Sequence, residues 1–279
     1  MPDPLLLRDY APHSELVVPE HSVAQARYPA IDVHNHLPVT DRRVAGTDWG
    51  RMVAMMDAVN VRSVVNLSGG WGQGLRTNLA ALDRAYPGRF YSFCTIDFAD
   101  VAAPGWIKRA EKQLREDIAA GARGLKIFKR LGLEYRDPAG RLVLPDDERL
   151  SDLWDAAGEM RVPVLIHTAD PTAFFKPLDA HNERWDELGA HPDWHFFGDR
   201  YPSFQQLIDA LYHVVESHPG TQFITAHVGC YPENLGFVSD MLDRYPNLAT
   251  DISARMAELG RAPYSARTWF LRHADRILF

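Results

Sequence analysis

Residues 30–38 read AIDVHNHLP, and this stretch decides how the rest of the chain is interpreted. Its apolar start is typical of a buried strand, and its end carries His34 and His36. Side chains two residues apart in a strand point to the same side, so both imidazoles leave this strand in one direction. Imidazoles are costly to bury unless their nitrogens have partners. The stretch therefore indicates a strand that delivers two side chains to a common site.

Short apolar runs of this kind recur along the chain and alternate with longer amphipathic segments. Helices are expected over residues 107–118, 150–160 and 203–218, and the last begins with the capping-box pair Ser203 and Gln206. Such alternation is typical of parallel strands covered by helices. The expected strands are 30–37, 63–68, 90–97, 124–128, 162–168, 222–229, 248–253 and 276–279.

Eight alternating units in 279 residues predict an α/β protein with a (β/α)8 barrel, whose chemistry lies at the C-terminal ends of the strands. A doubly wound open sheet is the alternative, because periodicity alone does not separate the two folds. Residues 1–29 are expected to form an N-terminal arm, and residues 30–279 the barrel. The fifth and sixth strands start about 60 residues apart, which predicts a long loop insertion at 169–202 that covers or binds a ligand.

Composition excludes several classes of function. The net charge of −7, without a Lys/Arg run, gives no electrostatic footprint for nucleic acid or anionic lipid. No stretch has the length of a membrane span, and no secretory leader is visible, so a cytoplasmic protein is expected. Cys94 and Cys230 are expected to be buried free thiols rather than a disulfide. The expected partner is a small-molecule substrate, and a homodimer is the assembly considered.

Polar side chains stand at the ends of four further strands. Lys126 lies on the fourth strand, His167 and His227 end the fifth and sixth, and Asp251 ends the seventh. Taken singly, each is explained as a hydrogen-bonded histidine or a paired charge within a fold. Together with the first strand they favour one divalent metal, because strand ends of a barrel meet at one mouth. Imidazole nitrogens suit zinc, and also manganese, iron, cobalt or nickel.

This combination resembles the amidohydrolase superfamily, and specifically the subgroup called amidohydrolase 2. The resemblance rests on the H-x-H, the strand-four lysine, the two later histidines and the aspartate of NLATDIS, and it runs from about residue 27 to the end. It implies a distorted (β/α)8 barrel in which His34, His36 and His167 hold one divalent metal. It also implies that His227 binds or protonates the substrate beside a metal-bound water.

The eighth strand departs from the family pattern. In the family this strand continues into Gly, then Ser or Thr, then an Asp that binds the metal and accepts a proton from the attacking water. Here RILF ends at Phe279, so the eighth strand is expected to be truncated. Asp251 is then a catalytic candidate that substitutes in part, although its position in relatives implies a supporting hydrogen bond.

The expected function is that of a metal-dependent hydrolase that uses an activated water to cleave a C–N or C–O bond in an amide, lactone or ester. The resemblance equally admits a non-oxidative decarboxylase of unsaturated or aromatic acids on the same metal site. A third possibility, of another class, is a barrel that binds a small ligand without turning it over. Lys126 is expected to be an uncarboxylated amine that supports the fold or binds a carboxylate. Arg255 either grips a substrate carboxylate or is solvated, and Trp185 of the long loop either shapes an apolar pocket or packs in a surface flap.

Overall fold

The strands of the computed structural model, which describes residues 5–44 and 46–279, are all parallel and lie in two sheets. The first sheet has the order β1-β2-β3, and the second has the order β4-β5-β6-β7-β8. The bounds are β1 Ala30–Asn35, β2 Val61–Asn66, β3 Phe90–Ser92, β4 Leu125–Ile127, β5 Val164–Ile166, β6 Phe223–Thr225, β7 Leu248–Asp251 and β8 Ile277–Leu278.

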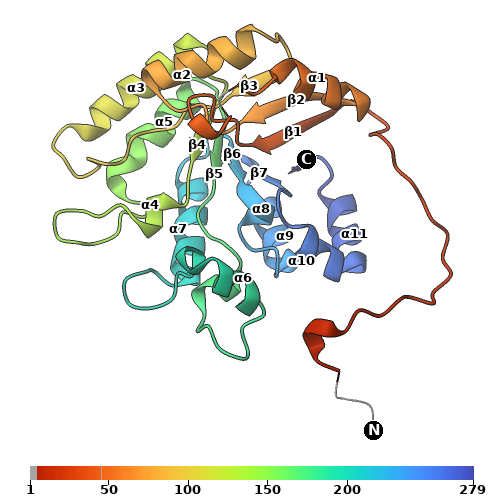
Figure 1. Ribbon diagram of the computed structural model, residues 1–279. Helices are drawn as coiled ribbons and strands as arrows, with labels where there is room; N and C mark the ends of the chain where they lie inside the picture. Colours follow the sequence, from red (N-terminus) through yellow and green to blue (C-terminus); the bar gives the residue numbers. More distant parts are fainter. Residues whose placement is uncertain (1–4, 45) are drawn as a thin grey trace.

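Hydrogen bonds connect the two sheets at both seams. Beyond β3, the Cys94 N–H donates to the Gly124 carbonyl at 2.9 Å, and the Lys126 N–H donates to the Cys94 carbonyl at 2.8 Å. At the other seam, the Val33 N–H donates to the Phe279 carbonyl at 2.7 Å. The C-terminus accordingly lies beside β1 (Figure 1). The strands thus follow one another in chain order around a distorted (β/α)8 barrel, and the predicted fold class is confirmed.

Most of the helices lie outside the strands (Figure 1), and apolar residues of the longer ones belong to the core. In α7, the Gln206 N–H donates to Ser203 Oγ at 3.2 Å and the Ser203 N–H donates to Gln206 Oε1 at 2.8 Å, so the expected capping box is present. The helices are α1 Trp49–Ala58, α2 Gly72–Leu79, α3 Trp106–Ala120, α4 Arg130–Leu133, α5 Ser151–Glu159, α6 Trp185–Ala190, α7 Phe204–Ser217, α8 Ala226–Gly229, α9 Leu235–Arg244, α10 Met256–Arg261 and α11 Pro263–Arg272.

The core has a layer on each side of the strands, because alternate strand residues face opposite ways. On β5, Val164 and Ile166 pack with the helices, whereas Leu165 joins a smaller cluster with Phe93 and Ile224. This smaller cluster fills the inside of the barrel, as the packed interior of such barrels requires. The strand ends above it are therefore held by close packing on both faces.

The long insertion and the arm differ in how they are ordered. Residues 169–202 contain α6 and two short 3-10 helices, Thr172–Phe175 and Pro192–Trp194. The arm runs away from the barrel, and its described residues 5–25 are exposed (Figure 1).

Both cysteines are buried and free, as expected. No helix within residues 5–44 or 46–279 combines the length and apolar composition needed to cross a bilayer.

Candidate metal centre

Four histidine rings form a continuous row at the strand ends. The ring centroids of His36 and His34 are 5.3 Å apart, those of His34 and His227 are 4.6 Å apart, and those of His227 and His167 are 4.4 Å apart. These residues come from the ends of β1, β5 and β6. The structure therefore brings together the four histidines that the sequence singled out.

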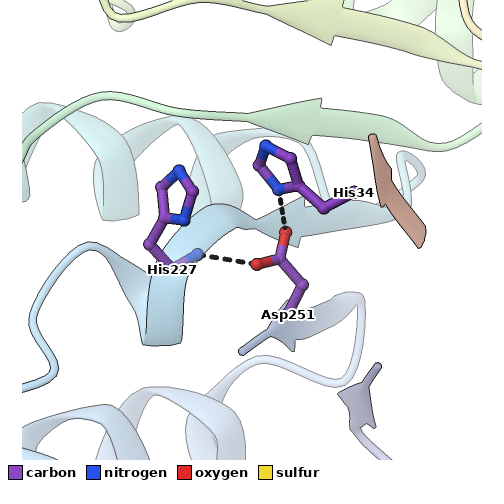
Figure 2. A group of neighbouring side chains, drawn as sticks. All are labelled: His34, His227 and Asp251. Carbon is purple, nitrogen blue, oxygen red and sulfur yellow. Dashed lines mark hydrogen bonds and ion pairs between the residues drawn. The ribbon is translucent and has the colours of Figure 1, made fainter. Parts of the chain in front are cut away.

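Asp251, at the end of β7, forms hydrogen bonds with two of these histidines, His34 and His227 (Figure 2). Its Oδ2 lies 2.8 Å from His34 Nδ1, and its Oδ1 accepts the His227 backbone N–H at 2.9 Å and the Ser253 N–H at 3.0 Å. The Asp251 side chain is fully buried. One ligand atom from each of His34, His227 and Asp251 lies within 4.8 Å of the others. This trio overlaps the predicted ligand set of His34, His36 and His167 only at His34.

The Nδ1 atoms of the other histidines are also engaged. His227 Nδ1 lies 2.8 Å from the Ser253 carbonyl oxygen, and His36 Nδ1 lies 2.9 Å from Ser68 Oγ. A carbonyl only accepts, so His227 carries its proton on Nδ1 and keeps a lone pair on Nε2. Metal-binding histidines are commonly held in this way through the nitrogen that does not bind the metal. His227 therefore keeps Nε2 unprotonated, whereas the tautomer of His36 depends on whether the Ser68 hydroxyl donates or accepts.

His167 provides the clearest test of whether these residues fit a metal. Its Nε2 is buried and has no hydrogen-bond partner, although Asp170 Oδ1 lies 3.3 Å away. A buried nitrogen of this kind is costly unless it binds something. Its neighbours in the row are further imidazoles, which are good ligands for divalent transition metals. The residues present therefore fit a divalent metal.

Burial favours the neutral form of three histidines of the row, His36, His167 and His227, and the neutral form is the one that binds a metal. Burial lowers the pKa of His167 to about 4, with the charge of Lys126 contributing in the same direction and Asp170 opposing it. His36 is open to solvent on one side, but burial of the rest of the ring and the charge of Lys126 also lower its pKa to about 4. Burial, and then the charge of His167, hold the pKa of His227 well below its usual value.

Asp170 is a site residue that the sequence reasoning missed. Its carboxylate pairs with Lys129 Nζ and lies 3.9 Å from Arg255 Nη2, in addition to its approach to His167. Burial opposes ionisation, but His167 and Lys129 outweigh it and hold the pKa of Asp170 well below its usual range. The sequence spacing could have identified this residue, because Asp170 follows His167 by three residues just past the fifth strand.

His227 stands in a left-handed turn rather than in the strand that was expected over 222–229. The strand β6 ends at Thr225, and residues 227–230 have φ values of 59°, 59°, 66° and 58°. Left-handed backbone costs roughly 1–2 kcal/mol for each residue other than glycine, and Val228 is β-branched. The prediction failed here because this turn is stabilised by neighbouring β7, which a single strand pattern does not reveal.

Lys126 lies beside the histidine row and borders a cavity. Its side chain is buried, its Nζ has no hydrogen-bond partner, and burial lowers its pKa to about 8, with Asp251 opposing. Phe128 links it to the row, since the Phe128 ring lies 5.7 Å from the His36 ring and 5.2 Å from Lys126 Nζ. The cavity measures about 270 Å³ and is lined by Trp71, Thr95, Ile96, Asp97, Phe98, Ala99, Lys126, Phe128, Arg130 and Tyr135.

The other two residues predicted to bind substrate differ in their surroundings. Arg255 is buried, so the solvated alternative is wrong, and its Nε has no hydrogen-bond partner. Trp185 begins α6 and is 55% exposed. Arg255 therefore presents an unsatisfied donor next to Asp170, whereas Trp185 lies on the surface.

Comparison with known proteins finds a matching family and solved structures of similar fold. The profile of a family described as amidohydrolase matches residues 31–279. No curated protein matches the sequence significantly. Among solved structures, a TIM-barrel protein from Bordetella bronchiseptica is 19% identical, with a TM-score of 0.58 over 90% of this chain and 84% of that one. A 2,6-dihydroxybenzoate decarboxylase from Rhizobium is 17% identical, with a TM-score of 0.55 over 90% and 87%. At these identities the likeness concerns the fold.

Proposed function

This chain belongs to the amidohydrolase family, and we propose that it holds one divalent metal through His34, His36 and His167 and hydrolyses a C–N or C–O bond of a small substrate. The observation that carries the proposal is the row of four imidazoles, in which Nδ1 of three rings is already engaged. Zinc suits such nitrogen ligands best, and manganese, iron, cobalt and nickel also accept them.

The proposed roles follow from the hydrogen bonds. A divalent metal bound here polarises a substrate carbonyl and lowers the pKa of water. His227 has its lone pair on Nε2, so it takes a proton from the attacking water and passes it to the leaving group. Both oxygens of Asp251 are engaged, by His34 and by backbone N–H groups of the His227 and Ser253 loops. Asp251 therefore orients the histidines and does not itself accept the proton.

The cavity beside the row supports a small substrate that is carboxylated or aromatic. Phe128 and Tyr135 supply apolar walls, while Lys126 offers an ammonium group without a partner. A buried donor that lacks a partner favours a ligand with an acceptor at that point. Arg255 lies close enough to His227 to affect its pKa and offers a second unsatisfied donor.

Decarboxylation of an unsaturated or aromatic acid is the second candidate, and one observation favours it. Both oxygens of Asp251 are engaged by hydrogen bonds, so Asp251 does not offer a base to an attacking water. Decarboxylation needs no such base, because it needs a grip on the carboxylate and a proton donor for the product carbon. The Rhizobium decarboxylase with the same fold is consistent with this second candidate.

The first experiment measures metal content and then reaction type. The purified chain is stripped with a chelator, reloaded with Zn²⁺, Mn²⁺ or Co²⁺, and tested on a panel of lactones, amides and aromatic acids. Ring opening or amide cleavage supports the hydrolase, and release of carbon dioxide supports the decarboxylase. Failure to retain about one divalent ion would overturn both candidates. Tight metal binding without any turnover would instead favour a ligand-binding barrel.

Lys126→Met tests the proposed binding of a carboxylate. Methionine keeps most of the volume and removes the charge, so KM for a carboxylated substrate should rise about tenfold or more while KM for a neutral analogue changes little. Lys112→Met is the control, because Lys112 is exposed on α3. Equal losses for both substrates would contradict carboxylate binding at Lys126.

A further inference from the structure

The turn that carries His227 is held from two sides by neighbouring residues of β7. Asp251 Oδ1 accepts the His227 N–H at 2.9 Å, and Thr250 Oγ1 accepts the Gly229 N–H at 2.8 Å. Successive residues of a strand point to opposite faces, so these two side chains reach the turn from opposite faces of β7. The left-handed segment is therefore bracketed at its first and third residues.

Thr250 makes three hydrogen bonds through its hydroxyl, one of them to the Asp251 carbonyl at 3.3 Å. Its side chain is fully buried, and its hydroxyl donates to the Thr225 carbonyl, the last carbonyl of β6, at 2.9 Å. The hydroxyl thus spans the point at which β6 changes into the left-handed turn. The Gly229 site is equally constrained, because a Cβ there would lie 2.6 Å from the Tyr212 hydroxyl oxygen.

Left-handed backbone persists at non-glycine residues only where the surroundings impose it. Three of the four residues of this turn are not glycine, and the first of them, His227, faces the rings of His34 and His167. If the turn relaxed, the imidazole would leave this position. The contacts that impose the turn therefore also set where the His227 ring stands.

We propose that Thr250 is a positioning residue, whose hydroxyl locks the left-handed turn at residues 227–230 and so fixes the His227 ring in the histidine row. This rests on the proposed function only for the chemistry that His227 performs. The placement of the ring itself is a property of the chain without metal.

The test compares Thr250→Val, which removes the hydroxyl at nearly constant volume, with Thr250→Ser, which keeps it. Thr221→Val is the matched control, since Thr221 is also buried and its hydroxyl donates to the Trp154 carbonyl at 2.8 Å, outside the turn. The first readout is ¹⁵N NMR of the histidine rings in chelator-treated protein. His227 should show one tautomer, protonated at Nδ1, in the parent, in Thr250→Ser and in Thr221→Val. In Thr250→Val its signal should shift or split.

The second readout is the affinity and absorption spectrum of Co²⁺. His227 lies beside the proposed ligands and is not one of them, so Thr250→Val should alter the Co²⁺ spectrum while Co²⁺ affinity falls less than about tenfold, and Thr250→Ser should restore the parent spectrum. An unchanged His227 resonance in Thr250→Val would overturn the inference, whatever the metal result. Absence of Co²⁺ binding by the parent chain would instead count against the proposed function and leave the NMR test intact.

Wild-type protein provides a measurement that does not depend on folding of the variant. The Gly229 amide should exchange with solvent at least 100-fold more slowly than the amide of Gly198, an exposed glycine of the long insertion. Exchange of Gly229 at a comparable rate would mean that the Thr250 hydrogen bond is absent, and this result too would overturn the inference.

Discussion

The ends of β1 and β6 both deliver histidines to the same row, but they do so by different means. At the end of β1 the backbone carries His34 and His36 two residues apart, and His36 is partly exposed and hydrogen-bonded to one hydroxyl, that of Ser68. After β6 the backbone turns left-handed, and His227 is buried and fastened through its N–H and its Nδ1. The placement of the histidines at the end of β1 depends on local spacing. The placement of His227 after β6 depends on contacts from another strand.

This difference has an energetic consequence. Extended backbone at the end of β1 carries little conformational cost, so its histidines need few supporting contacts. The turn after β6 carries roughly 1–2 kcal/mol of strain for each non-glycine residue, which the fold around it must offset. We therefore expect metal affinity to fall most when a residue that contacts both strand ends is replaced. It should fall least when the replaced residue contacts only the end of β1.

His34 is common to both ends, because it lies on β1 and shares Asp251 with His227. His34→Ala should lower metal affinity by more than about 100-fold, since even outer hydrogen-bond partners of a metal site cost about 10–100-fold. The measurement is metal content after dialysis, by plasma emission spectrometry. His218→Ala is the control, because His218 also pairs with an aspartate, Asp155, at 2.7 Å. Equal metal content in both variants would argue against His34 as a ligand.

Asp251→Asn should produce the next largest effect. An amide cannot accept both from His34 Nδ1 and from the two backbone N–H groups with the same strength as a carboxylate. Metal affinity should fall about 10–100-fold. Titration with Co²⁺ measures this, and Asp155→Asn should leave the affinity unchanged. If Asp251→Asn lowered Co²⁺ affinity no more than Asp155→Asn does, the two strand ends would not be coupled through the Asp251 carboxylate.

Acid should destabilise the metal-free protein through the buried histidines. The pKa of His167 is about 4 in the fold, whereas a histidine of an unfolded chain titrates near 6.5. The unfolded state therefore binds the proton more readily, so stability is level above about pH 6.5 and falls as the pH drops toward 4.

Urea unfolding of chelator-treated protein at pH 7.5 and pH 5.0 measures this effect. His167 alone should account for a loss on the order of 2 kcal/mol in the free energy of unfolding between these two conditions. His167→Gln should reduce the loss, because glutamine does not titrate. A pH dependence identical in the variant would show that His167 is already solvated in the fold.

Ser68→Ala should have the smallest effect of the series. Ser68 supports only His36, whose ring is partly exposed and can take water in place of the hydroxyl. Metal affinity should fall less than about tenfold, and the free energy of unfolding should change by less than about 1 kcal/mol. If Ser68→Ala lowered metal affinity as much as Asp251→Asn does, the end of β1 would be as sensitive to its supporting contacts as the end of β6.

The sequence predicted those parts of the centre that depend on regular local structure. Period-two spacing placed His34 and His36, and apolar runs ending in polar residues located His167 and Asp251. The left-handed turn and the role of Asp170 were not predictable in this way. Both depend on contacts between different strands, namely Thr250 with Gly229 and Lys129 with Asp170. Hydrophobic periodicity within one strand carries no information about such pairs.

The exposed arm has a practical consequence for work with this protein. Residues 5–25 are exposed, and Arg8 and Arg27 stand within or next to this stretch. Proteases cut first at segments of this kind. A brief trypsin digest should therefore shorten the chain toward residue 28 and leave a resistant fragment that still contains every histidine of the row. The length of that fragment, read by mass spectrometry, would mark where the barrel begins.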